Sequence, residues 1–197
     1  MRFRAGCYPM GCRADKSETG RAFQGKLMFK DHDESRADWP LLQNGAVNLF
    51  WRKSVFQDAR SQLSDLGYEI AEIEYQTPET FRSALSEALK WKEQFGYEPW
   101  GGGLDALADG VGGFPFPQSK SAAICIENYD LFAKDQPEIA LAVLDIVEAQ
   151  SRNHLLVGCR LIALIQTNDA SLEFGPLGCR SATWNRREWL WKDRGLA

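Results

Sequence analysis

The chain has 197 residues and a formal net charge of −4, with 44% hydrophobic and 25% charged residues. This composition is ordinary for a folded globular protein and excludes a mostly disordered, collagen-like or coiled-coil chain. No run approaches the roughly 18 apolar residues of a transmembrane helix, and the basic N-terminus lacks the apolar core of a signal peptide. We therefore expect a cytoplasmic protein with no membrane partner.

Regular structure is predicted from about residue 46 onward. Residues 1–43 are punctuated by glycine and by a run of charged residues, which predicts an irregular extension. A strand is expected over residues 46–51, followed by a helix over 54–66 that Ser54 caps and Gly67 ends. A second strand is expected over 69–75, and Thr77 with Pro78 opens the next helix.

The second half of the chain continues the alternation of strands and helices. A short helix flanked by glycines is expected over residues 104–111, and a buried strand over 122–128. A helix opened by Asp135 is predicted over 137–151, and a second buried strand over 160–167. The last segment holds Trp184, Trp189 and Trp191, which we expect to pack on the body because exposed tryptophans are costly.

The order of these elements predicts an α/β fold. The two late strands are almost continuously apolar, which is typical of a parallel sheet covered by helices on both faces. We therefore expect a small, mostly parallel sheet with an N-terminal extension. The divisions predicted are an irregular extension at 1–43, a strand–helix unit at 44–67, a main domain at 68–169 and a tail at 170–197 that packs on it.

The cysteine and histidine content predicts neither a metal site nor a cofactor. The five cysteines stand at positions 7, 12, 125, 159 and 179, without a Cys-x-x-Cys pair, and there are only two histidines. A zinc site would need an unusual ligand set. Free thiols in a reducing compartment are the simpler interpretation.

The acidic charge is concentrated in the middle of the chain. Residues 68–118 carry nine acidic and three basic side chains, a balance of −6. Direct binding of nucleic acid by this segment is disfavoured, because phosphate groups need Lys and Arg. The segment either forms a solvated acidic surface or attracts a basic partner.

Two carboxylates on the short helix are the strongest functional signal. Asp105 and Asp109 are four residues apart and therefore share one helix face. Like charges at this spacing repel mildly, so the pair does nothing for the helix itself. It is either solvated, ligates a cation, or presents negative charge to a partner.

The segment 68–113 resembles the barstar family of intracellular inhibitors of the ribonuclease barnase. The residues that carry the resemblance are Leu-Asp-Ala-Leu-Ala-Asp at 104–109, preceded by a loop rich in Tyr, Trp and Gly and followed by Gly113 and Phe114. The flanking elements extend the resemblance to about residues 45–197, as in family members with an added strand–helix unit and a tail like that at 184–196.

The resemblance implies a protein inhibitor rather than an enzyme. Barstar places this helix and the loop before it in the ribonuclease active site, where its carboxylates stand in for RNA phosphates. The implied partner is a basic toxin nuclease, bound one to one, and the chain would be its immunity protein in a toxin–antitoxin pair. The positions that the resemblance assigns to the interface are Tyr97, Trp100, Gly102, Gly103, Asp105, Ala108, Asp109 and Gly112. A third acidic position of the family falls on Glu148, or on Asn153 in the other alignment.

The departures from the family pattern predict a different toxin, or weak binding to barnase. Pro99 replaces a contacting Tyr, and Ala108 replaces a Trp within the motif. The alternatives are a barstar-like fold reused for another protein partner, and a small α/β enzyme or metal-binding protein that uses Asp105 and Asp109.

Overall fold

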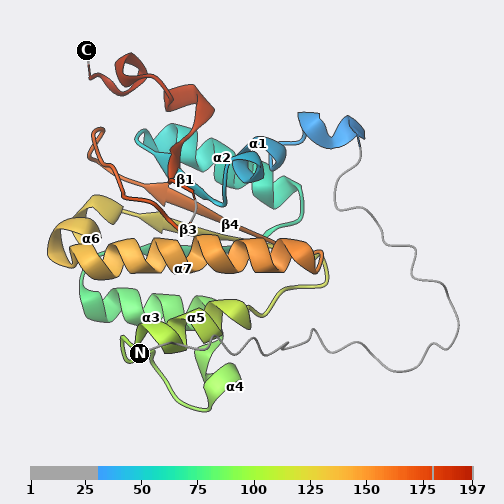
Figure 1. Cartoon of the computed structure of the whole chain (residues 1–197), viewed down its shortest axis with the longest axis vertical. Coiled ribbons are helices and arrows are strands. Elements are labelled where there is room, and N and C mark those ends of the chain that lie inside the picture. The colour runs from blue at the N-terminus through green and yellow to red at the C-terminus, as the bar shows by residue number, and fades with distance from the viewer. Residues whose placement is uncertain (1–30, 179, 197) are drawn as a thin grey trace, which may run out of the picture.

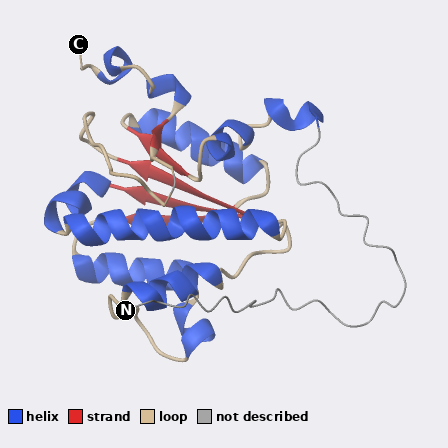
Figure 2. Ribbon diagram, viewed as in Figure 1, coloured by secondary structure: helices blue, strands red, loops and turns tan. Residues whose placement is uncertain are grey.

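The computed structural model describes residues 31–178 and 180–196, and within them the chain forms an α/β fold around one parallel sheet (Figures 1 and 2). The five strands lie in the order β2-β3-β4-β1-β5, and every neighbouring pair is parallel. Their bounds are β1 Val47–Phe50, β2 Glu69–Glu74, β3 Ser121–Glu127, β4 Arg160–Gln166 and β5 Thr183–Trp184.

The helices cover both faces of the sheet because the chain reverses direction across it. From β1 it moves over three positions to the edge strand β2, then returns through β3 and β4. Right-handed crossovers in opposite directions put their helices on opposite faces. One face carries α1 (Trp39–Gln43) and α2 (Lys53–Asp65), and the other carries α3 (Pro78–Ala88), α5 (Leu104–Gly112) and α7 (Pro137–Leu156) (Figure 1).

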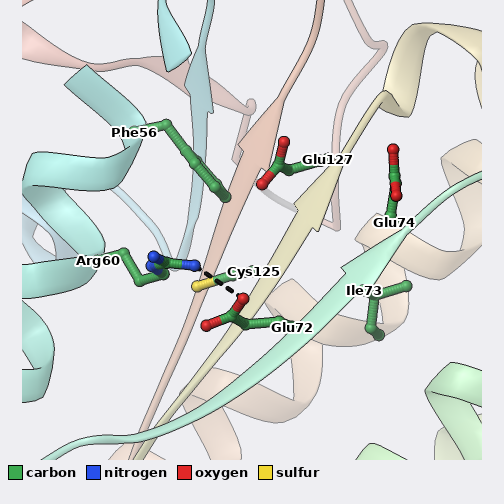
Figure 3. Close-up of a pocket in the computed structure, with 7 residues that line it drawn as sticks. All are labelled: Phe56, Arg60, Glu72, Ile73, Glu74, Cys125 and Glu127. Carbon is green, nitrogen blue, oxygen red and sulfur yellow. Dashed lines mark ion pairs between the residues drawn. The ribbon is translucent and has the colours of Figure 1, made fainter. Parts of the chain in front are cut away.

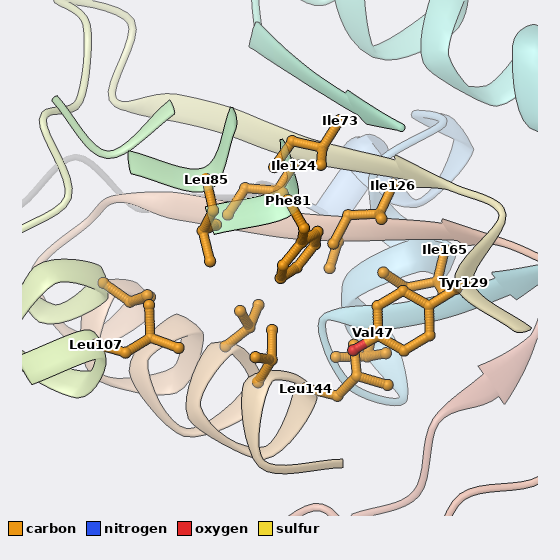
Figure 4. Close-up of a cluster of buried hydrophobic side chains, with 14 of the residues drawn as sticks. Val47, Ile73, Phe81, Leu85, Leu107, Ile124, Ile126, Tyr129, Leu144 and Ile165 are labelled. Atoms are coloured by element: carbon orange, nitrogen blue, oxygen red, sulfur yellow. The ribbon is translucent and has the colours of Figure 1, made fainter. Parts of the chain in front are cut away.

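Two hydrophobic cores lie on the two faces, because successive side chains of a strand point to opposite sides. In β3, Ile124 and Ile126 join the larger core under α3, α5 and α7, shown in Figure 4. Their neighbours Ala123 and Cys125 join the smaller core under α2. This burial on both faces explains why β3 reads as a continuous apolar run.

The predicted strands and long helices are confirmed to within a few residues. The caps differ: Thr77 caps α3 as predicted, but α2 begins after Arg52 rather than at Ser54, and α7 continues five residues past the predicted end to Leu156. Two short helices were not predicted, α4 (Trp91–Phe95) and α6 (Tyr129–Asp135), and α6 takes up Asp135, which was expected to open α7.

The part of the N-terminal extension that the structure describes contains short helices. Within the stretch expected to be irregular, η1 (Asp31–Ser35) and α1 form short helices, and Leu41 of α1 is buried in the smaller core. Residues 1–30 lie outside the described residues, as do Cys7, Cys12 and Cys179. Cys125 and Cys159 are buried.

The C-terminal tail packs on the body through only part of its length. Its strand β5 pairs with β1, and two 3-10 helices follow, η2 (Arg186–Glu188) and η3 (Trp191–Arg194). Trp184 is half-buried, but Trp189 and Trp191 are 53% and 64% exposed. The expectation that all three tryptophans are buried is therefore wrong for the last two.

Candidate functional site on helix α5

The loop before α5 is fixed at the tryptophan that precedes its glycines. Trp100 is buried, its backbone N–H donates to Ser86 Oγ at 2.7 Å, and its indole Nε1 donates to the Gly103 carbonyl at 2.8 Å. Gly102 has φ +95°, a conformation that residues with a Cβ rarely adopt. The helix then starts at Leu104 with Gly103 as N-cap and no side-chain cap.

The inner face of α5 packs mainly on α7 and also meets Trp91 of α4. Leu107 and Val111 enter the main core, and Gly110 lies against the fully buried ring of Trp91. A Cβ on Gly110 would stand 2.6 Å from Trp91 Cζ3, so only glycine permits this approach. The Gln94 amide of α4 also donates to the Gly110 carbonyl at 3.2 Å.

The C-terminal end of α5 is tied to α7 by a buried histidine. His154 Nε2 lies 2.8 Å from the Val111 carbonyl, and because a carbonyl only accepts, this nitrogen must carry the proton. Phe116 packs edge-on against the imidazole, with 4.8 Å between ring centroids. Burial lowers the pKa of His154 below its ordinary value, against the hydrogen bond to Val111, which raises it.

The outer face of α5 presents both aspartates to solvent. Asp105 and Asp109 are exposed, and neither carboxylate takes part in an ion pair or hydrogen bond within residues 31–178 and 180–196. Asp105 lies in the first turn, where the helix dipole favours an acid. Asp109 lies in the second half of the helix, where the dipole gives no such benefit, so its placement has no evident structural reason.

The structure keeps most of the predicted interface residues on this surface and turns two inward. Tyr97 is 51% exposed, and Gly102, Gly103, Ala108 and Gly112 are exposed or half-exposed. Trp100 and Glu148 are each only 2% exposed. Trp100 therefore supports the loop from inside.

Glu148 holds the start of β1 rather than facing solvent. Its Oε2 accepts the Ala46 backbone N–H at 2.7 Å, and Gly45 passes so close that a Cβ there would stand 3.1 Å from this oxygen. Of the two alternatives for the third acidic position, only Asn153 is exposed. Its amide donates to Gln150 Oε1 at 3.0 Å, and Gln150 borders Gly112 of α5.

Most of the residues that position this surface were not identified from the sequence. Trp91 and Gln94 belong to α4, which is only five residues long and leaves no periodic pattern. His154 lies beyond the predicted end of α7, and it is 43 positions from its partner Val111. Gly110 was the one signal in the sequence that could have indicated the contact with α4, because a glycine within a helix often marks the close approach of another element.

A second candidate site, shown in Figure 3, lies on the α2 side of the sheet and offers little chemistry. The pocket holds about 260 Å³ and is lined by Phe56, Arg60, Glu72, Ile73, Glu74, Cys125 and Glu127. Two of its three carboxylates are in ion pairs, Glu72 with Arg60 at 2.8 Å and Glu127 with Lys53 at 3.0 Å, and the third, Glu74, accepts hydrogen bonds from the Gln76 and Asn128 amides. Burial raises the pKa of Cys125 to about 12, so its thiol is not a nucleophile at neutral pH.

Comparisons of the chain with protein-family models, curated proteins and solved structures give no match. Among the side chains that the structure describes, no three His, Cys, Asp or Glu residues gather to hold a metal ion. Nor does any described helix have the length and apolar character needed to span a membrane.

Proposed function

We propose that the chain is a barstar-like inhibitor that binds a basic toxin nuclease through α5 and the loop before it. The nuclease we favour is a ribonuclease. One observation carries the proposal. Asp109 is exposed on a packed helix and forms no ion pair with the residues that the structure describes, at a position where neither helix stability nor the core calls for an acid. A carboxylate held in this way is free to take the place of an RNA phosphate among the cationic groups of an enzyme.

The packing of α5 supports the proposal because preorganised groups bind with a smaller entropy cost. Trp91 and Gln94 of α4 and His154 of α7 hold the helix, and Trp100 holds the loop. The two aspartates therefore need little ordering when a partner arrives. The surrounding acidic segment, with its balance of −6, adds long-range attraction for a basic protein.

Inhibition of purified basic ribonucleases, barnase among them, tests the proposal. The chain is expected to inhibit at least one of them at a ratio of one to one. Asp109→Ala is expected to weaken that inhibition by about 2–5 kcal/mol, because it leaves a buried cation of the enzyme unpaired. Asp105→Ala is expected to act in the same direction.

Glu138→Ala is the matched control. It removes the same charge from an exposed position at the first turn of α7, whereas the α5 contacts lie near the far end of that 20-residue helix. Equal loss of inhibition in Asp109→Ala and Glu138→Ala would contradict the assignment of the site. Capture from the host lysate by wild type but not by Asp105→Ala/Asp109→Ala would then identify the natural partner, and a captured protein without nuclease activity would favour a reused fold.

A further inference from the structure

The C-terminal tail carries a cluster of exposed apolar side chains that nothing in the inhibitor proposal uses. Trp189, Leu190 and Trp191 are consecutive and are 53%, 50% and 64% exposed. In Figure 1 the tail lies at the end of the molecule opposite α4 and α5. A partner seated on α5 therefore leaves these three residues, here called the tail tip, uncovered. Contiguous exposed apolar surface usually marks an interaction site.

Buried charged residues hold the tail tip in place. Glu188 is fully buried, and its carboxylate accepts the backbone N–H groups of Trp51 and Arg52 at 3.0 and 2.8 Å, together with Arg52 Nε at 3.0 Å. Arg194 is also buried and lies over the Trp184 ring, 4.3 Å from its centroid. The tail is thus a fixed structure that presents apolar side chains outward.

The backbone carbonyls of the tail tip are already satisfied internally. Each carbonyl from Glu188 to Lys192 accepts a hydrogen bond from within the tail. The donors are Arg194 Nη1 for Glu188 and Trp189, and the N–H groups of Asp193, Leu196 and Gly195 for Leu190, Trp191 and Lys192. Such a segment enters an apolar medium without leaving unpaired carbonyls, which is what a lipid environment requires.

The exposed charges beside the tail tip are basic, whereas the neighbouring Asp193 is half-buried and its carboxylate accepts the Leu190 N–H at 3.2 Å. Arg186, Arg187 and Lys192 are exposed, and Arg187 pairs with Asp58 at 2.7 Å. Within the part of the chain that the structure describes, Arg186 and Lys192 have no ion pair. The acidic segment 68–118, in contrast, includes α4 and α5 at the other end of the molecule.

We propose that the tail tip binds the surface of an anionic membrane. Trp and Leu side chains would enter the headgroup boundary, while Arg186 and Lys192 meet the lipid phosphates or carboxylates. A tip whose backbone carbonyls are already hydrogen-bonded and which has exposed basic side chains beside it suits an anionic lipid surface. In this orientation the acidic end points away from the membrane and α5 stays open to solution. The proposal does not depend on the inhibitor function.

Binding of the full chain to lipid vesicles tests it. Vesicles of phosphatidylcholine alone are compared with vesicles containing phosphatidylglycerol, by sedimentation and by tryptophan emission, at low and at high salt. We expect sedimentation with the anionic vesicles, a blue shift of the emission and release at high salt. Trp189→Ser/Trp191→Ser is expected to lower the partition coefficient at least about tenfold, and Arg186→Glu/Lys192→Glu by more than about fivefold for each lost cation.

Leu156→Ser/Val157→Ser is the matched control, because these residues are 86% and 60% exposed at the end of α7 and lie outside the tail. It should bind vesicles like the wild type. All these positions are exposed, and circular dichroism checks that each variant is folded. The proposal is overturned if the wild type does not bind anionic vesicles at low salt. It is also overturned if Trp189→Ser/Trp191→Ser binds these vesicles as well as the wild type. Failure with lipid would leave an acidic protein as the partner for the tip.

Discussion

A single hydrogen atom at residue 110 sets how closely α5 and α4 approach. Gly110 stands in van der Waals contact with the fully buried Trp91, and a methyl group there would be 2.6 Å from the nearest ring atom. Trp91 is packed against Phe95 and cannot easily withdraw. The residue acts on the candidate site indirectly, by deciding where the helix that carries Asp105 and Asp109 lies.

Gly110→Ala is therefore expected to lower the free energy of unfolding by about 1–3 kcal/mol, the usual cost of overpacking a core. This loss is expected although alanine is favoured over glycine by about 1 kcal/mol within a helix. Gly112→Ala on the same helix is the control, because its Cβ would meet only the flexible end of Gln150 at 3.4 Å. Urea denaturation measures both variants, and a Gly110→Ala protein as stable as Gly112→Ala would contradict the close contact.

Residue types alone could not show which residues of the candidate site are buried and which are exposed. Asp105 and Asp109 were predictable as surface residues, because their spacing puts them on the helix face opposite Leu107 and Val111. Trp100 and Glu148 were expected at the interface, but both are buried. Their burial depends on Ser86 and on the Ala46 backbone, 14 and 102 positions away in the chain, and no local pattern reports such contacts.

At the scale of elements, the long helices and the strands were predictable and the short helices were not. Periodic apolar residues and the Thr77 cap identify α3, and continuous apolar runs identify β3 and β4. Helices α4 and α6 have five and seven residues and follow Lys90 and Asn128, whose φ values are +49° and +58°. Neither preceding residue caps its helix with a side chain, so the usual start signal is missing.

The contact between α5 and α7 makes the stability of the fold depend on pH through His154. Burial lowers the pKa of His154 in the folded state below its ordinary value of 6.5. The unfolded chain therefore binds a proton more readily, and stability falls as the pH drops through 6.5 towards the lower pKa of the folded state. Above 6.5 this contribution is fully present.

Replacing His154 by Gln is expected to flatten the dependence of the unfolding free energy on pH between about pH 7 and pH 5. The Gln amide still offers a donor for Val111, so the variant removes the titration more than the contact. Urea denaturation of both proteins at a series of pH values gives the two slopes. Because all other titrating groups are common to both, equal slopes would show that His154 does not contribute to the loss of stability in acid.

At the scale of the whole molecule, the acidic segment and the tail give the protein two ends of different character. Of the balance of −6 in segment 68–118, half comes from the three acids of β2, and a balance of −3 lies over residues 75–118, which include α3, α4 and α5. The tail exposes Arg186, Lys192 and three apolar side chains at the other end. The acidic segment could be identified from the sequence, but the tail tip could not, because its tryptophans were expected to pack on the body. The two proposed binding surfaces, on α5 and at the tail tip, therefore lie at opposite ends of the molecule.

The acidic end is expected to steer a basic nuclease towards α5, and salt tests this. Exposed charges further apart than the Debye length, about 10 Å at 0.1 M salt, are largely screened. With a ribonuclease that the chain inhibits, the association rate should therefore fall as salt rises, whereas the dissociation rate, set by short-range contacts, should change little.

Glu93→Gln/Glu98→Gln removes two exposed charges from α4 and the loop that follows it. This variant should lower the association rate and its salt dependence, and leave the dissociation rate nearly unchanged. Stopped-flow fluorescence over a salt series measures both rates. If association did not depend on salt, or if this variant changed only dissociation, the acidic segment would be a solvated surface that plays no part in guiding the partner.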